Sequence, residues 1–481
     1  MQAPAEPIVG QQDLPARRVD AHGRVHVDYR AIVALAAPLI LNSSVQTLLN
    51  LTDTWFLGRL STDAVAAMGT IYWPIIAVIM LLSGTGLAVQ TLVAQAHGAR
   101  DRPRAARATW LGLWSAALLL PVFAAIAIAG PFVLRPFTLA PEIERLAREF
   151  WFPRLLCAPA GVALWALFGF FNGIGRPAVT VAISSCVTLA NIALNQLFMF
   201  ELGMGMAGSA WATSASLLLG LVLALIVWHG RAFRQPFAIG ESRRLDWREL
   251  GRQLVLGFPM GLLYAADLIG AAIFQIMQVD LSPADGAVTQ IVMMLTSAAY
   301  LPGVGIAIAG TTLVGQAIGA GDRAWAYRLG NASIGLAAGY MGFIGLLLAA
   351  LGPWVLPWFV QPGDPLAPRV LALGGSILWV AAAYQLFDGL NLGSGFALRG
   401  AGESAVPAGL VIVLSWFIFV PLAHTLTFDH ARAWIPGLPQ LGWGSLGGWT
   451  ALLVYVLLLG STLFLRWRSR AWQSIDLTRR A

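Results

Sequence analysis

The sequence predicts an all-α integral membrane protein with twelve transmembrane helices in two six-helix bundles. Three observations predict this fold class: hydrophobic residues make up 58% of the 481 residues and charged residues only 11%, long apolar segments succeed one another, and a motif recurs in the second half of the chain. Soluble domains contain about 25% charged residues. A chain with so few charges cannot cover a globular surface with ions, so most of its surface must face lipid.

The apolar segments define the predicted elements in order. Residues 1–29 are polar and lack the apolar core of a signal peptide, so we interpret them as a mobile cytoplasmic tail. Segment 31–57 is almost wholly apolar and exceeds the about 20 residues that a helix needs to cross a bilayer. The same pattern predicts further spans at 64–90, 108–132, 154–172, 178–200, 208–229, 253–279, 286–316, 331–360, 369–396, 405–424 and 447–466.

The basic residues predict the orientation of these spans. All 30 basic residues are arginines. If the tail is cytoplasmic, the alternating loops place only seven of them on the opposite side, at positions 59, 135, 145, 148, 154, 369 and 432. This bias follows the positive-inside rule. We therefore expect both termini to be cytoplasmic.

A repeat relates the two halves of the chain. Residues 91–102 recur as residues 312–323 with nine of twelve positions identical, at an offset of 312 − 91 = 221 that also carries Pro38 onto Pro259 and Ser61 onto Ser282. A weaker echo pairs Gly173-x-Gly175 with Gly400-x-Gly402. Each copy contains six spans, so both enter the membrane in the same direction. The predicted bundles are therefore related by a pseudo-two-fold axis along the membrane normal.

The repeat also predicts the organisation of the chain. The N-terminal bundle covers 30–229, the C-terminal bundle covers 253–468, and a C-terminal cytoplasmic tail follows at 469–481. Residues 230–252 carry six arginines and form the natural linker between the bundles. We expect this linker to lie along the cytoplasmic surface.

Three aspartates lie inside apolar spans. These residues are Asp53, Asp267 and Asp388. Insertion of a charged aspartate at the centre of a membrane helix costs about 2.5–3.5 kcal/mol on insertion scales, so a functional role is the default explanation for an acid at such a position. Asp267 and Asp388 have no basic partner in their own spans, and such a carboxylate either is protonated or holds a bound cation. These two states are the halves of an ion-coupling cycle. Tyr384 lies one helical turn before Asp388 and shares its face.

Asp53 allows a second interpretation. It lies six residues from Arg59, so the two could form a structural ion pair. Asn191 and Asn195 stand one turn apart in the fifth span and could contact Asp53 in a six-helix bundle, or they could simply join neighbouring helices by hydrogen bonds. The same structural alternative, a cap or a local hydrogen bond, exists for Asp267 and Asp388.

Several function classes are excluded by the residues that are absent or scattered. The net charge of +7 resides in loops rather than on one face of a folded domain, so nucleic acid is not the expected partner. The two cysteines provide neither a disulfide framework nor paired zinc ligands. The chain contains no lysine, so it has no phosphate-binding loop for ATP hydrolysis.

The sequence resembles the multidrug and toxic compound extrusion (MATE) family, and within it the bacterial NorM-type branch. The resemblance covers nearly the whole chain from about residue 30. The motifs that carry it are Pro38 with residues 52–60 (TDTWFLGRL), the two Gln-x-x-Gly-Ala elements, residues 256–259 (LGFP), residues 384–388 (YQLFD) and residues 397–400 (ALRG).

The resemblance implies an antiporter in the bacterial inner membrane, not an enzyme, that works without a cofactor and as a monomer. It implies export of bulky, often cationic amphiphilic drugs in exchange for inward H⁺ or Na⁺. Carried over residue by residue, the protonatable carboxylate of the N-terminal bundle is Asp53, with the polar pair Asn191 and Asn195. The cation-binding acids of the C-terminal bundle are Asp267 and Asp388, which would hold Na⁺ in a sodium-coupled protein, with Tyr384 nearby.

Two features leave alternatives open. The NorM-type pattern usually has Glu where this chain has Asp267, so the coupling ion stays open between H⁺ and Na⁺. A lipid-linked oligosaccharide flippase of the same superfamily is the second candidate, and the absence of a mid-span arginine argues against the basic cavity that it needs. An integral-membrane transferase is the third, and the sequence lacks the His/Asp cluster that it would show at one membrane face.

Overall fold

The computed structural model describes residues 14–135, 140–360, 365–435, 437–475 and 477, and nearly all of them are helical. Eleven of its helices are long and apolar enough to cross a membrane, and a bent helix pair makes twelve. The helices that match the predicted spans are α1 (Tyr29–Leu60), α2 (Thr62–Gly98), α3 (Arg102–Ile128), α5 (Pro141–Leu156) with α6 (Ala158–Gly173), α7 (Pro177–Asn195), α8 (Gly205–Trp228), α10 (Trp247–Leu281), α11 (Pro283–Gly319), α12 (Arg323–Val355), α13 (Ala367–Gly400), α14 (Ala405–Leu414) with α15 (Val420–Thr427), and α16 (Gly444–Arg468).

The remaining elements are short. The short helices α4 (Gly130–Leu134) and α9 (Arg231–Arg234) follow the ends of α3 and α8. Single π-helical turns extend α7 at Gln196–Glu201 and join α14 to α15 at Ser415–Phe419. In the described part of the chain, 3₁₀ turns lie at Glu241–Arg243, Leu356–Phe359 and Ala471–Ser474. The linker between the halves is therefore partly helical, and α10 begins at Trp247, inside the range 230–252 that the sequence assigned to the linker.

The fourth span differs from its prediction. The span predicted at 154–172 begins earlier than expected, because α5 and α6 form a pair that begins at Pro141 and bends by 44°. The first part of this span escaped prediction because α5 carries charged residues that lower its mean hydropathy. Among them is Arg145, which forms ion pairs with Glu142 and Glu149. The bend lies at Cys157, two residues before Pro159, whose ring nitrogen cannot donate a helical hydrogen bond.

The predicted mobile tail is ordered in its second half. Strands β1 (Arg17–Val19) and β2 (Val25–Val27) form an antiparallel hairpin, and Trp325 of α12 donates its indole N–H to the carbonyl oxygen of Pro15 at 2.9 Å. Asp20 closes the turn by accepting the backbone N–H of Arg24, which lowers the pKa of its carboxyl. Residues 1–13, the rest of the predicted tail, lie outside the described residues.

The helix ends reproduce the repeat of the sequence. Ser61 caps α2 by accepting the backbone N–H of Ala64, and Ser282, 221 residues later, caps α11 in the same extended conformation. Asp101 and Asp322, again 221 residues apart, cap α3 and α12. A side chain that accepts the orphan N–H groups of the first turn fixes where a helix starts. The repeated motif therefore sets equivalent helix boundaries in the two halves.

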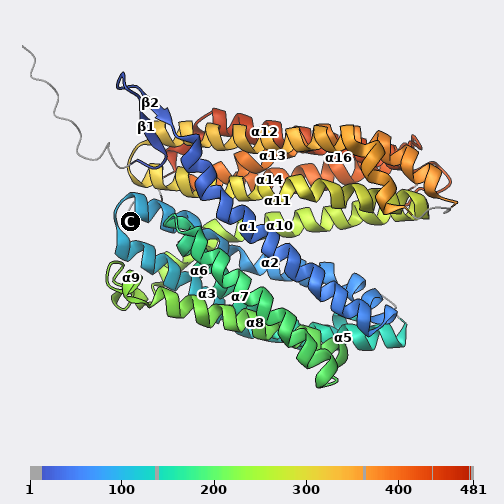
Figure 1. The fold of residues 1–481 in the computed structure, drawn as a ribbon, viewed down its shortest axis with the longest axis horizontal. Coiled ribbons are helices and arrows are strands. Elements are labelled where there is room, and N and C mark those ends of the chain that lie inside the picture. The colour runs from blue at the N-terminus through green and yellow to red at the C-terminus, as the bar shows by residue number, and fades with distance from the viewer. Residues whose placement is uncertain (1–13, 136–139, 361–364, 436, 476, 478–481) are drawn as a thin grey trace, which may run out of the picture.

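Figure 1 shows two groups of helices that approach each other near the C-terminus and diverge toward the opposite end. Helices α10 to α16 form one group, and α3 and α5 to α8 belong to the other. Helix α1 contacts both groups. Near its start Ala36 and Leu39 pack against Ile306 and Ala309 of α11, and near its end it packs along α7.

The two halves exchange equivalent hydrogen bonds where they meet. The Gln95 amide donates to the carbonyl oxygen of Gly400 at 3.0 Å, and the Gln316 amide donates to that of Gly173 at 2.9 Å. These carbonyl groups end α13 and α6 and have no partner within their helices. Such reciprocity is expected where two copies of a repeat face each other across a two-fold axis.

Glycine permits this approach. A Cβ atom on Gly98 would lie 1.9 Å from the carbonyl oxygen of Gln316, and one on Gly319 would lie 1.9 Å from that of Gln95. Small residues let membrane helices approach closely enough for hydrogen bonds between their backbones and side chains. The repeated Gln-x-x-Gly element therefore supplies both the donor and the space for it.

Substitution of Gly319 by alanine tests this packing. The added methyl group has only backbone atoms to displace, so we expect the free energy of unfolding in detergent to fall by about 1–3 kcal/mol. The matched control is Gly339→Ala, because a Cβ atom on Gly339 of α12 would have nothing within 4 Å. Equal unfolding curves for the two variants would contradict the packing described above.

Candidate functional site

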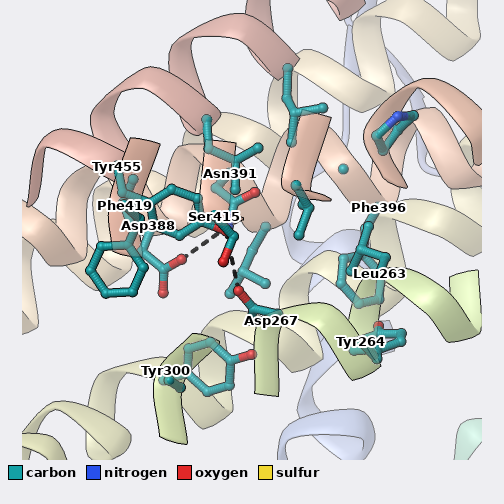
Figure 2. Close-up of a pocket in the computed structure, with 18 of the residues that line it drawn as sticks. Leu263, Tyr264, Asp267, Tyr300, Asp388, Asn391, Phe396, Ser415, Phe419 and Tyr455 are labelled. Carbon is teal, nitrogen blue, oxygen red and sulfur yellow. Dashed lines mark hydrogen bonds between the residues drawn. The ribbon is translucent and has the colours of Figure 1, made fainter. Parts of the chain in front are cut away.

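The two intramembrane aspartates of the second half line one cavity. Asp267 lies midway along α10 and Asp388 lies on α13, and both contribute to a cavity of about 250 Å³ (Figure 2). Asp388 is 4% exposed, whereas Asp267 is exposed to the cavity. Their convergence makes this cavity the candidate site of the second half.

Each carboxylate has polar neighbours but few of them. Asn391 donates to one oxygen of Asp388 at 3.1 Å, and the Tyr384 hydroxyl donates to the other at 3.4 Å. Tyr455 of α16 donates its hydroxyl to Asp267 at 3.2 Å. A carboxylate has about four lone-pair positions, so both acids keep acceptor capacity free. Acids with spare oxygens, facing one another across a cavity, form a suitable receptor for a proton or an oxygen-preferring cation.

The third aspartate lies in a different environment in the first half. Asp53 of α1 accepts hydrogen bonds from Asn195 at 2.6 Å and from Thr213 at 3.2 Å. Asn195 also donates to Asn191, and Asn191 donates to Thr213, which closes a four-residue network across α1, α7 and α8. The predicted contact between Asp53 and the asparagine pair is therefore present. Like Asp388, Asp53 accepts hydrogen bonds from two neutral side chains.

The alternative ion pair of Asp53 is absent among the interactions that the structure describes. The guanidinium of Arg59 lies instead over the rings of Trp55 and Phe200, at 5.1 and 5.8 Å. Arg59 is at the end of α1, where a stacked arginine still reaches the polar region of a bilayer. The distance of six residues along a helix placed the two side chains on different faces.

Two arginines line the cavities of the aspartates. Arg154, which the sequence placed at the start of the fourth span, belongs to α5 and lines a cavity of about 380 Å³ together with Asp53. It lies near the middle of the bent pair α5 and α6, so the expectation that no arginine falls mid-span is wrong at this position. Arg399 lies at the end of α13, outside the predicted tenth span, is 9% exposed, and lines the cavity of Asp267 and Asp388.

Four further residues complete the site. Thr213, Tyr300, Tyr455 and Arg399 were not predicted, because each comes from a helix other than those that carry the predicted partners or from a helix end. A signal was present for the tyrosine of α16, which interrupts the apolar run at 450–460. Among the described residues, no cluster of three or more His, Cys, Asp or Glu side chains could hold a metal ion. Any Na⁺ would therefore depend on the two acids and on neutral oxygens.

The family comparison matches the repeat. The MatE family model aligns to residues 38–197 and again to residues 259–425. The two matches begin 259 − 38 = 221 residues apart, which is the offset found within the sequence. Together they cover more than half of the chain.

Relatives and solved structures agree with this match. The chain is 30% identical to a probable multidrug resistance protein NorM of Pseudomonas aeruginosa over 92% of this chain and 90% of the relative. It is 28% identical to the corresponding protein of Chromobacterium violaceum, over 92% and 94% of the two chains. A crystal structure of a MATE protein in complex with MaL6 superposes with a TM-score of 0.79 at 21% identity, covering 92% and 97%.

A second solved structure has the same fold. An outward-facing multidrug resistance MATE family transporter of the MOP superfamily superposes with a TM-score of 0.78 at 21% identity, covering 92% of this chain and 96% of the other. At this identity the likeness establishes the fold. The two family matches and the 30% identity over nearly full length establish descent, and the chain therefore belongs to the MatE family of transporters.

Proposed function

We propose that the protein exports bulky, cationic or amphiphilic compounds across a bacterial inner membrane in exchange for inward H⁺ or Na⁺. The observation that carries this proposal is the pair Asp267 and Asp388, which converge from two helices on one cavity and keep free acceptor positions. The multidrug resistance proteins that the chain resembles support the substrate class. The proposed transporter works as a monomer and needs no cofactor.

Competition for the carboxylates explains antiport. A protonated or cation-bound acid no longer offers a negative charge to a cationic drug, so ion and drug weaken each other's binding. Each ligand then favours the state in which the other leaves. Asp267 is exposed and lines the cavity, so a drug can approach it more easily, while the buried Asp388 is better placed to hold the ion.

The orientation of the protein follows from its arginines. The end at which the halves contact each other also carries the hairpin of β1 and β2, helix α9 of the linker, the start of α3 and the end of α16, segments that are rich in arginine. We place this end in the cytoplasm, in line with the positive-inside rule. The two groups of helices then meet on the cytoplasmic side and diverge toward the exterior.

Asp388→Asn tests the role of the buried acid. The amide keeps the size of the side chain and its bond with Asn391 but cannot take up a proton or balance a cation, so we expect a folded protein in the membrane with at least tenfold slower drug efflux from cells. The matched control is Asp63→Asn, an exposed acid in the first turn of α2. Normal drug resistance conferred by Asp388→Asn would remove this residue from the mechanism.

The coupling ion is identified by transport of an ethidium-like dye into or out of liposomes that contain the purified protein. We expect dye movement under an imposed Na⁺ gradient or under an imposed pH gradient, but not under both, and loss of that movement in Asp267→Asn. Movement under neither gradient, with folded protein, would overturn drug antiport and make the lipid-flippase alternative the next one to test.

A double-mutant cycle tests the network of the first half. Asp53→Ala and Asn195→Ala each remove one end of a buried hydrogen bond of 2.6 Å. Polar contacts between membrane helices contribute on average about 0.6 kcal/mol and at most about 1.7 kcal/mol. We expect a coupling energy in this range from unfolding in detergent. The control pair Asp53→Ala and Asn391→Ala, in different halves, should be additive, and additivity of the first pair would contradict the network.

A further inference from the structure

Two cavities of the second half share a wall. The cavity of Asp267 and Asp388 extends along α13 to Arg399, Glu403 and Ser404 at the end where the halves meet. A second cavity of about 960 Å³ opens at that end, between α3, α10 and the chain that follows α13. Of the described residues that line the two cavities, only Glu403 and Ser404 belong to both. These two residues therefore form the partition between the candidate ion site and the proposed cytoplasmic side.

Glu403 has one free carboxylate oxygen in this partition. The residue is 4% exposed, and its Oε1 atom accepts from Arg466, with the Nε atom at 2.8 Å. Its Oε2 atom is buried and has no hydrogen-bond partner among the described residues. Buried acceptors are normally satisfied, and an unpaired one requires an explanation. A proton or a water molecule delivered along the cavity would satisfy it.

The repeat shows that the turn does not need this acid. Gly175 and Gly402 both have positive φ, and the residues that follow them, Arg176 and Glu403, both donate their backbone N–H five residues back, at 2.8 and 2.9 Å. Arg176 is exposed, with its guanidinium over the ring of Phe233. The same backbone therefore presents an exposed cation in one half and a buried acid in the other. Glu403 accordingly has a role that the first half lacks.

The charges around Glu403 favour a proton over Na⁺. The walls of the second cavity carry four arginines, Arg104 and Arg107 of α3 and Arg248 and Arg252 of α10. The cavity also contains Glu249, which lies 3.4 Å from Arg107. Arg466 of α16 pairs with Glu403, and Arg399 of α13 lines the inner cavity together with it. A hydrated Na⁺ would meet repulsion along this route. A proton moves by exchange of hydrogen bonds and needs only an acceptor between the two cavities.

We propose that Glu403 is the relay carboxylate through which protons leave the acid pair of the second half toward the cytoplasm. About 18 Å of helix separate Asp388 from the end of α13, so the transfer runs through water in the cavity. The O–H bond of the protonated aspartate breaks, water carries the proton, and an O–H bond forms at Oε2 of Glu403. That bond then breaks in turn, and the proton passes to water in the outer cavity. This inference rests on the proposed function and names its ion.

The test compares Glu403→Gln, Glu403→Asp and the unmodified protein in liposomes under an imposed pH gradient. Gln keeps an oxygen for Arg466 but cannot relay a proton, so we expect dye transport to fall at least tenfold while the affinity for the dye in detergent stays within twofold. Asp should restore at least a third of the rate. A small weak acid such as formate, which can carry the proton past the partition, should speed transport by Glu403→Gln but not by the unmodified protein.

Two further variants separate a relay from a structural ion pair. Arg466→Gln breaks the pair but keeps the carboxylate, and Glu241→Gln alters an exposed acid of the linker. Both should transport at no less than half the normal rate.

Three results with these variants would each overturn the relay. They are equal losses of transport in Glu403→Gln and Arg466→Gln, normal transport by Glu403→Gln, and no effect of formate on transport by Glu403→Gln. Transport by the unmodified protein under a Na⁺ gradient alone would also overturn it while leaving efflux intact. Absence of all dye transport by the unmodified protein would overturn the proposed function, and the relay with it.

Discussion

The architecture depends on how the two halves satisfy each other's helix ends. The carbonyl groups that end α6 and α13 have no partner within their own helices and belong to buried residues, so each needs a partner from another part of the chain. Gln316 and Gln95 supply these partners from the opposite half. Further bonds of the same kind surround them, such as those from Thr91 to the carbonyl oxygen of Arg399 and from Thr312 to that of Asn172. Because these bonds lie at one end, the halves are joined there and can diverge at the other.

The halves share a backbone plan but differ in how they treat buried charge. In the first half one aspartate, Asp53, accepts hydrogen bonds from an amide and a hydroxyl group and lines a cavity together with Arg154. In the second half two aspartates line one cavity, with tyrosine hydroxyl groups as neighbours of both. Desolvation of a carboxylate is unfavourable, so a cavity with two acids gains more from binding a positive charge than a cavity that pairs one acid with an arginine.

Much of the fold could be predicted from the sequence, because hydropathy and the repeat report on lipid contact and helix boundaries. The features that escaped prediction depend on contacts between distant segments. The charged residues of α5 made the first part of the fourth span look polar in sequence. Arg154 lies close to the bend after Leu156 and lines a cavity together with Asp53, which the sequence alone did not indicate. The acids themselves stood out in their apolar spans, whereas Tyr455 became a partner of Asp267 only through the packing of α16 against α10.

The crossing of α1 between the groups has a consequence for the integrity of the chain. The hairpin before α1 is attached to α12, and the first part of α1 packs on α11, although both segments lie at the start of the chain. The N-terminal segment of the chain therefore packs against the second half. After a cut in the linker near residue 240, the two fragments would stay associated. To separate, they would have to lose the packing of α1 on α11 as well as the hydrogen bonds that Gln95 and Gln316 donate between the halves.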